Sequence, residues 1–141
     1  MLDTKKLVVG TLIGGIALQL GGYLIFDVAV ADFYAANRSP QLLIRETPLR
    51  WAAAAGDFFM AALITLGIVV RRADNPTIGA GLLTGGVIAG LAWFSIHFTQ
   101  YAFRSEENFM LIFVDPLLEA IHGGIAGAIL AAVLARIPKA A

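Results

Sequence analysis

Four long apolar runs limit the architecture that this chain can adopt. We place them at about residues 7–30, 51–70, 78–101 and 112–135. Each holds the roughly 20 residues that a helix needs to cross about 30 Å of hydrocarbon. In lipid every backbone N–H and C=O must be paired within the protein, so runs of this length favour helices. The sequence therefore predicts an all-α polytopic membrane protein, with four transmembrane helices in an up-down bundle that forms one domain over residues 1–141.

The composition supports a membrane protein and argues against a soluble bundle. Hydrophobic residues make up 59% of the chain and charged residues 14%, whereas a soluble domain has about 45–50% and about 25%. The polar face that each helix of a soluble bundle needs is missing from all four runs. The net charge is zero and no cysteine is present. We therefore expect the lipid bilayer as a partner and no nucleic acid, which requires a basic patch, and disulfides and thiolate metal sites are excluded.

The lysines and arginines predict the orientation. In an up-down bundle the N-terminus, the 71–77 loop and the C-terminus share one side of the membrane. Six basic residues fall on that side: Lys5, Lys6, Arg71, Arg72, Arg136 and Lys139. Four fall on the other side: Arg38, Arg45, Arg50 and Arg104. The positive-inside rule then predicts that both termini are cytoplasmic. Because the first run exceeds the roughly 7–15 apolar residues of a signal peptide, we expect it to remain as a helix.

Glycine pairs at four-residue spacing indicate close helix packing. The pairs are Gly10 and Gly14, Gly81 and Gly85, Gly86 and Gly90, and Gly123 and Gly127. Small residues at this spacing let helix backbones approach in lipid. They can serve the bundle itself, or an interface in a homo-oligomer or a larger membrane complex. We favour the bundle, since four helices already offer many facing surfaces.

Polar side chains gather in the predicted outer half of the membrane, when depth is counted at about 1.5 Å per residue from the cytoplasmic ends. The deeper layer is a candidate intramembrane site formed by Gln19, Tyr23, Asp57, Glu119 and His122. The outer-interface polar layer consists of Asp27, His97 and Asp115. A carboxylate at the membrane centre costs about 2.5–3.5 kcal/mol and normally faces the bundle interior beside a partner.

The most specific hypothesis about the site concerns Asp57 and His122. Both fall at the same predicted depth, and Gln19 lies level with them. We expect Asp57 and His122 to meet directly or through one water. A carboxylate beside an imidazole can exchange protons near neutral pH. The alternative is that these polar groups only hold the helices together.

The last run contains the segment VDPLLEAIHGG. Asp115 before Pro116 predicts a helix start with Asp115 as the N-cap. Glu119 then falls near the first turn, where the helix dipole favours an anion. The plan of four spans, with Asp115, Pro116, Gly124 and Gly127 in the last one, resembles that of small four-helix bacterial integral membrane proteins that carry a domain of unknown function. The resemblance implies a multi-pass protein of the bacterial inner membrane and no particular activity.

Three functional hypotheses remain. The first is handling of protons, ions or a small ligand by the polar cluster, and the second is a structural or accessory subunit of a larger membrane complex. The third is a metal- or haem-binding protein, with Asp27, His97 and Asp115 as possible ligands of a divalent cation. The histidines His97 and His122 differ in predicted depth by roughly 9–10 Å, which disfavours one haem between them, and we expect no resident cofactor. The sequence contains no nucleophile constellation, phosphate loop or His-Glu-x-x-His motif, so we do not predict an enzyme.

Overall fold

The computed structural model describes residues 3–37, 47, 49–72, 76–104 and 108–138. These residues form five α-helices and one π-helical segment: α1 (Thr4–Gly22), η1 (Tyr23–Ala29), α2 (Ala31–Asn37), α3 (Arg50–Arg72), α4 (Ile78–Phe103) and α5 (Leu111–Leu134). The described part of the chain contains no strand. Four stretches are long and apolar enough to cross a membrane: Thr4–Ala29, Arg50–Arg71, Ile78–Phe103 and Leu111–Leu134. The predicted all-helical architecture with four long apolar helices is therefore confirmed.

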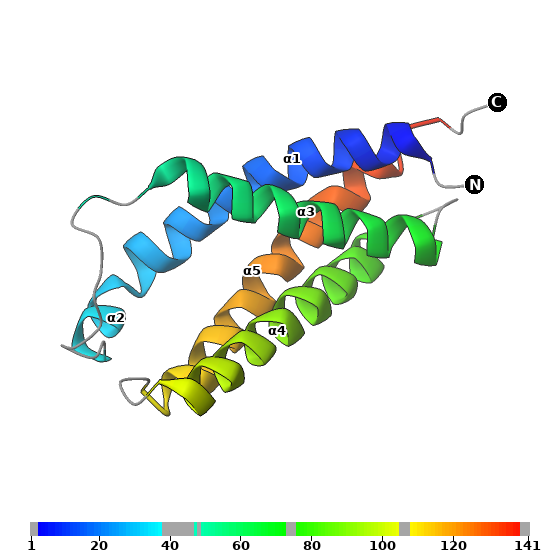
Figure 1. Cartoon of the computed structure of the whole chain (residues 1–141). Coiled ribbons are helices and arrows are strands. Elements are labelled where there is room, and N and C mark those ends of the chain that lie inside the picture. Colours follow the sequence, from blue (N-terminus) through cyan, green and yellow to red (C-terminus); the bar gives the residue numbers. More distant parts are fainter. Residues whose placement is uncertain (1–2, 38–46, 48, 73–75, 105–107, 139–141) are drawn as a thin grey trace.

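The four long helices form two antiparallel pairs (Figure 1). Helix α4 packs most extensively on α5, and α1 packs on α3. Helix α5 also contacts α1 and thereby joins the two pairs. The N- and C-termini lie at the same end of the molecule, and α2 lies at the opposite end (Figure 1). The helices therefore run up and down, as predicted.

Glycines bring α4 and α5 into backbone contact. A Cβ atom on Gly85 would overlap the carbonyl oxygen of Gly123, and one on Gly81 would overlap that of Gly127. Such small residues permit the close approach that stabilises helix pairs in lipid. These four glycines thus pack two helices of the same bundle together, which is the role that we favoured over an interface with another protein. Gly86 borders an apolar groove on the outer face of the same pair.

The α1–α3 pair meets through side chains of mixed size. Gly10 faces the buried side chain of Thr65, and Gly15 faces the ring of Phe58. At the end near the termini, Lys6 is only 3% exposed. The sequence indicates only that this lysine lies near the end of a helix, and the packing of the helices shows that it is buried.

The first apolar stretch changes geometry at its outer end. It is α-helical to Gly22 and then π-helical from Tyr23 to Ala29. The chain bends at Val30 and continues as the short helix α2. Neither the π-helix nor α2 is predicted from the sequence. Single π-turns in helices are frequent at functional sites, and η1 carries three of the side chains considered below.

The run that we placed at about residues 112–135 forms the last helix, but the predicted N-cap is wrong. Helix α5 begins at Leu111 with Met110 at its N-cap position, so Asp115 is not the cap and Pro116 lies inside the helix. Pro116 removes only the hydrogen bond to the carbonyl four residues earlier, and its ring is buried. The first turn contains no acidic residue, so the helix-dipole argument for Glu119 also fails. The carboxylate of Asp115 is free to contact other helices.

Candidate functional site

Gln19 and Asp57 join the first helix pair within the membrane-spanning region. The side-chain amide of Gln19 on α1 donates a hydrogen bond to Oδ2 of Asp57 on α3. Asp57 is half-buried and Gln19 is exposed. These two residues were predicted to lie at one level, and the structure brings them into contact.

His122 on α5 is almost fully buried, with 4% of its surface exposed. Its Nε2 atom lies 2.8 Å from the backbone oxygen of Leu18 on α1. Its Nδ1 atom lies 3.1 Å from Oε2 of Glu119, one turn earlier on α5. Because both ring nitrogens have these partners, the predicted direct hydrogen bond between His122 and Asp57 is not formed. Asp57 is still close enough to act on His122 electrostatically.

Two consecutive glycines of α1 explain how the imidazole reaches a backbone carbonyl. A Cβ atom on Gly21 would lie 3.0 Å from Cδ2 of His122, and one on Gly22 would lie 3.4 Å from Cε1. The ring of Phe26 on η1 covers the imidazole edge-to-face, at a centroid distance of 5.8 Å. This close approach was not predicted, although the consecutive glycines Gly21 and Gly22 beside Gln19 are a sequence signal for it.

The hydrogen bonds of His122 determine where its protons are. The Leu18 carbonyl can only accept, so Nε2 carries a hydrogen. If Nδ1 lacked a proton and Glu119 were ionised, two lone pairs would face each other 3.1 Å apart. The contact therefore requires one proton, which is held either by an imidazolium or by a carboxylic acid that donates to Nδ1. In this geometry Glu119 and His122 can share one proton between them.

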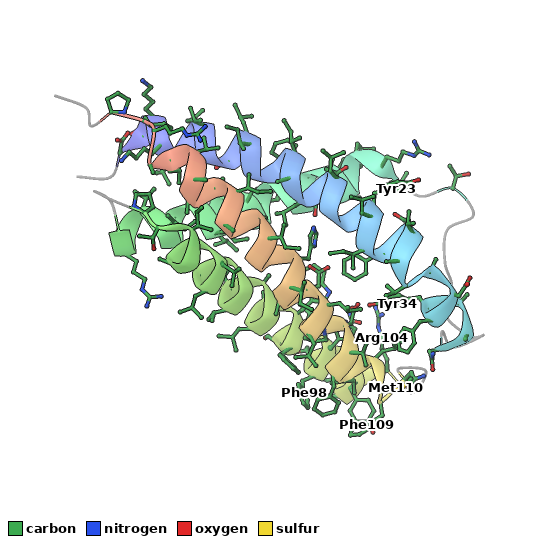
Figure 2. All side chains as sticks on the ribbon, turned by 180° about the vertical axis from the view of Figure 1, so that it is seen from behind. Tyr23, Tyr34, Phe98, Arg104, Phe109 and Met110 are labelled. Carbon is green, nitrogen blue, oxygen red and sulfur yellow. The ribbon has the colours of Figure 1, made fainter. Side chains whose placement is uncertain are left out.

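An open cavity of about 600 Å³ lies between α3 and the α1–η1 segment. Its lining residues are Gln19, Gly22, Tyr23, Phe26, Asp27, Arg50, Ala53 and Asp57. Tyr23, which Figure 2 labels, is 59% exposed. The cavity thus gathers three residues of the predicted deeper layer and one of the outer layer. Asp57 belongs both to the cavity, which it lines, and to the surroundings of His122, on which its charge acts.

A second polar cluster holds the outer end of the bundle together. His97 Nε2 on α4 lies 2.6 Å from Oδ2 of Asp115 on α5. The hydroxyl of Tyr34 on α2 donates to the other oxygen of the same carboxylate. Figure 2 shows Tyr34 and Arg104 at the end where α2 faces the α4–α5 hairpin. Two members of the predicted outer-interface layer therefore meet, and Tyr34 is a partner that the sequence did not indicate.

The proposed divalent-cation ligands are not assembled. Asp27 lines the cavity, whereas His97 and Asp115 belong to the outer cluster. Within the described ranges no group of three or more His, Cys, Asp or Glu side chains is arranged to hold a metal ion. The two histidines also belong to different clusters, His97 with Asp115 and His122 with Glu119.

Comparison with protein families, with characterised proteins and with solved structures finds no match to this chain.

Proposed function

We propose that this chain is a small multi-pass membrane protein that binds a proton at Glu119–His122 and couples its charge to the adjacent cavity. One observation carries the proposal: Nε2 donates its hydrogen to the Leu18 carbonyl, so the hydrogen-bond contact between Nδ1 and Glu119 requires a further, shared proton. Loss of that proton leaves the pair with a net negative charge. In a buried setting this charge is poorly screened and acts strongly on its neighbours.

The pair is placed to communicate with the cavity. Asp57 interacts with His122 through space and accepts the Gln19 hydrogen bond at the cavity wall. Phe26 contacts the imidazole and also lines the cavity. A change in the charge of Glu119–His122 therefore alters the electrostatic potential at Asp57.

Histidine protonation is the direct test. Protein with ¹⁵N-labelled histidine is placed in lipid nanodiscs, and the nitrogen shifts are followed between about pH 5 and about pH 9, the range in which histidine changes charge. We expect Nε2 of His122 to stay protonated throughout, while the Nδ1 signal changes. Glu119→Gln removes the ionisable carboxyl and should displace that transition. His97 provides the second, separately assigned signal, which Glu119→Gln should leave unchanged. An Nδ1 signal that is constant over this range, or identical in Glu119→Gln, would contradict the proposal.

Proton movement is tested in vesicles. Proteoliposomes that contain a trapped pH-sensitive dye receive an imposed pH gradient. We expect the intact protein to dissipate the gradient faster than empty vesicles and Glu119→Gln to lose the difference. Asp32→Asn, which neutralises an exposed carboxylate on α2, is the matched control and should keep it. Equal rates for the intact protein and Glu119→Gln would exclude a proton-conducting role for the pair.

A structural subunit is the second candidate, and a specific observation favours it. Every polar contact described above except Glu119–His122 also joins two helices, as in Gln19 with Asp57 and His122 with the Leu18 carbonyl. Membrane side-chain hydrogen bonds of this kind contribute about 0.6 kcal/mol each on average. If the role is only structural, Glu119→Gln should lower the melting temperature and leave vesicle pH gradients unaffected.

We further propose that the protein lies in a bacterial inner membrane with both termini in the cytoplasm. Six of the ten basic residues belong to the side that holds the termini, and the resemblance of the last helix to small bacterial membrane proteins supports this location. Arg38, Arg45 and Lys139 contribute to the charge comparison but lie outside the described residues. A C-terminal green fluorescent protein fusion should be fluorescent, and an alkaline phosphatase fusion at the same point should be inactive. Active phosphatase there would reverse the orientation.

A further inference from the structure

We infer that the cavity between α3 and the α1–η1 segment binds a small organic cation, and that binding is linked to release of the Glu119–His122 proton. The inference rests on the proposed function in one respect, because Glu119–His122 is taken as the proton site. Cation binding itself is argued from the cavity alone.

The lining of the cavity combines carboxylates with aromatic rings. Asp27 and Asp57 provide two negative charges, whereas Arg50 provides one positive charge. Tyr23 and Phe26 add ring surfaces. Aromatic faces attract ammonium groups, and the attraction is strongest where water is excluded. The cavity therefore suits a protonated or quaternary amine better than an anion.

The positions of the charges separate the two ends of the cavity. Arg50 is the first residue of α3 and precedes Asp57 by about two helical turns, roughly 10 Å. Asp57 accepts its hydrogen bond from Gln19, which is a neutral amide and leaves the carboxylate charge uncompensated at that contact. A cation at the Asp57 end is therefore attracted by a negative charge, whereas a cation at the other end is repelled by Arg50.

The size of the cavity argues for an organic ligand. A volume of about 600 Å³ is far larger than a bare metal ion requires. The two carboxylates are also too few for a metal site, since no group of three or more His, Cys, Asp or Glu side chains is assembled among the described residues. An amine with several carbon atoms can fill the space and contact both rings.

The linkage to the proton follows from the charges that face each group. His122 faces Glu119 on its own helix, the Leu18 carbonyl on α1 and, through space, Asp57 on α3. A cation beside Asp57 repels the shared proton and therefore favours its release. Binding linkage is reciprocal, so deprotonation of the pair must tighten cation binding by the same factor.

The test uses the full chain in lipid nanodiscs with tetraethylammonium as the probe. We expect saturable binding by calorimetry, tighter at high pH than at low pH, with protons released on binding. Asp57→Asn and Asp27→Asn should each weaken binding about tenfold, since each removes a charge at close range. Ala53→Phe, which fills the cavity without changing its charge, should also weaken binding. Asp32→Asn is the matched control for loss of a carboxylate outside the cavity and should bind like the intact protein.

The outcomes separate this inference from the proposed function. Binding that persists in Glu119→Gln without proton release supports the cavity and assigns the proton to the pair. Proton release that is unchanged in Glu119→Gln would refute the pair as the proton site but leave the cavity standing. Three results would each overturn the organic-cation site. The first is no saturable binding of tetraethylammonium by the intact protein, and the second is an affinity of folded Ala53→Phe and Asp27→Asn equal to that of the intact protein. The third is binding of sodium alone that is as tight as binding of tetraethylammonium.

Discussion

The two helix pairs of this molecule use their small residues in opposite ways. In α4–α5, Gly81 and Gly85 rest on Gly127 and Gly123, and the two backbones touch. In the α1–α3 half, Gly21 and Gly22 instead make room for the imidazole of His122, which comes from α5. The first arrangement leaves no room for a ligand between the helices, whereas the second accompanies a polar site and an open cavity. The α4–α5 pair is held by backbone contact and supplies Glu119 and His122, whereas the α1–α3 pair receives the imidazole and lines the cavity.

The largest effect is expected where the backbone contact of α4–α5 is broken. Gly85→Leu places a side chain where a Cβ already overlaps the Gly123 carbonyl oxygen. Overpacking of this kind costs about 1–3 kcal/mol and occasionally more, so we expect a large loss of folded protein in thermal unfolding and size-exclusion experiments. Gly79→Leu is the matched control on the same helix, because a Cβ there meets nothing within 4 Å. Similar losses in both variants would show that α4–α5 is not held by backbone contact.

The next effect concerns the link between the pairs. His122→Ala removes the hydrogen bond to the Leu18 carbonyl on α1 and leaves the carboxyl group of Glu119 without its imidazole partner. An unsatisfied buried polar group costs about 1–3 kcal/mol, which unfolding in detergent can measure. His122→Gln can again donate to that carbonyl and should recover part of the stability, but not the proton binding. Full recovery of vesicle pH dissipation in His122→Gln would contradict the role of the imidazole.

A smaller effect is expected at the outer cluster. Tyr34→Phe removes the hydroxyl that donates to Asp115. The average membrane hydrogen bond suggests a loss of about 0.6 kcal/mol. We expect faster hydrogen–deuterium exchange in α2 and unchanged exchange in α4 and α5. Tyr23→Phe is the control, because it removes a tyrosine hydroxyl from the cavity wall. It should leave hydrogen–deuterium exchange in α2 unchanged. Unchanged exchange in α2 of Tyr34→Phe would show that this contact does not hold the helix.

The smallest effect on stability is expected at Asp57. Asp57→Asn keeps an oxygen that can accept from Gln19, so we expect a change of about 0.6 kcal/mol or less in the free energy of unfolding. The same variant should nevertheless weaken cation binding. A melting temperature that falls as far as in His122→Ala would instead mark Asp57 as a structural residue.

For the polar residues, the sequence predicts depth in the membrane but not the contact partners. The depth count put Gln19 level with Asp57 and His97 level with Asp115, since rise per residue is regular in a helix, and both pairs are in contact in the structure. It did not identify the partners of His122. The partners of His122 depend on how each helix is rotated about its axis and where it crosses its neighbours. Depth alone does not distinguish between several polar residues that lie at the same level.

Local signals failed where packing overrides them. Asp115-Pro116 has the chemistry of a helix start, yet α5 begins at Leu111 and Asp115 binds His97 and Tyr34 instead. The π-helical turns of η1 follow directly after the segment that packs on His122. Inserted side chains are a recognised cause of irregular helix geometry, and periodicity in the sequence does not reveal them.

Amino-acid order alone determined that this protein has four long apolar helices and that glycines let them approach, because apolarity and residue spacing are properties of each helix by itself. Only the tertiary structure decided that His122 reaches the Leu18 carbonyl past Gly21 and Gly22 while its other ring nitrogen contacts Glu119. Only the tertiary structure also opened a cavity beside Asp57. Those features arise between helices, where the contact geometry is set by the relative rotation and crossing of elements far apart in the chain.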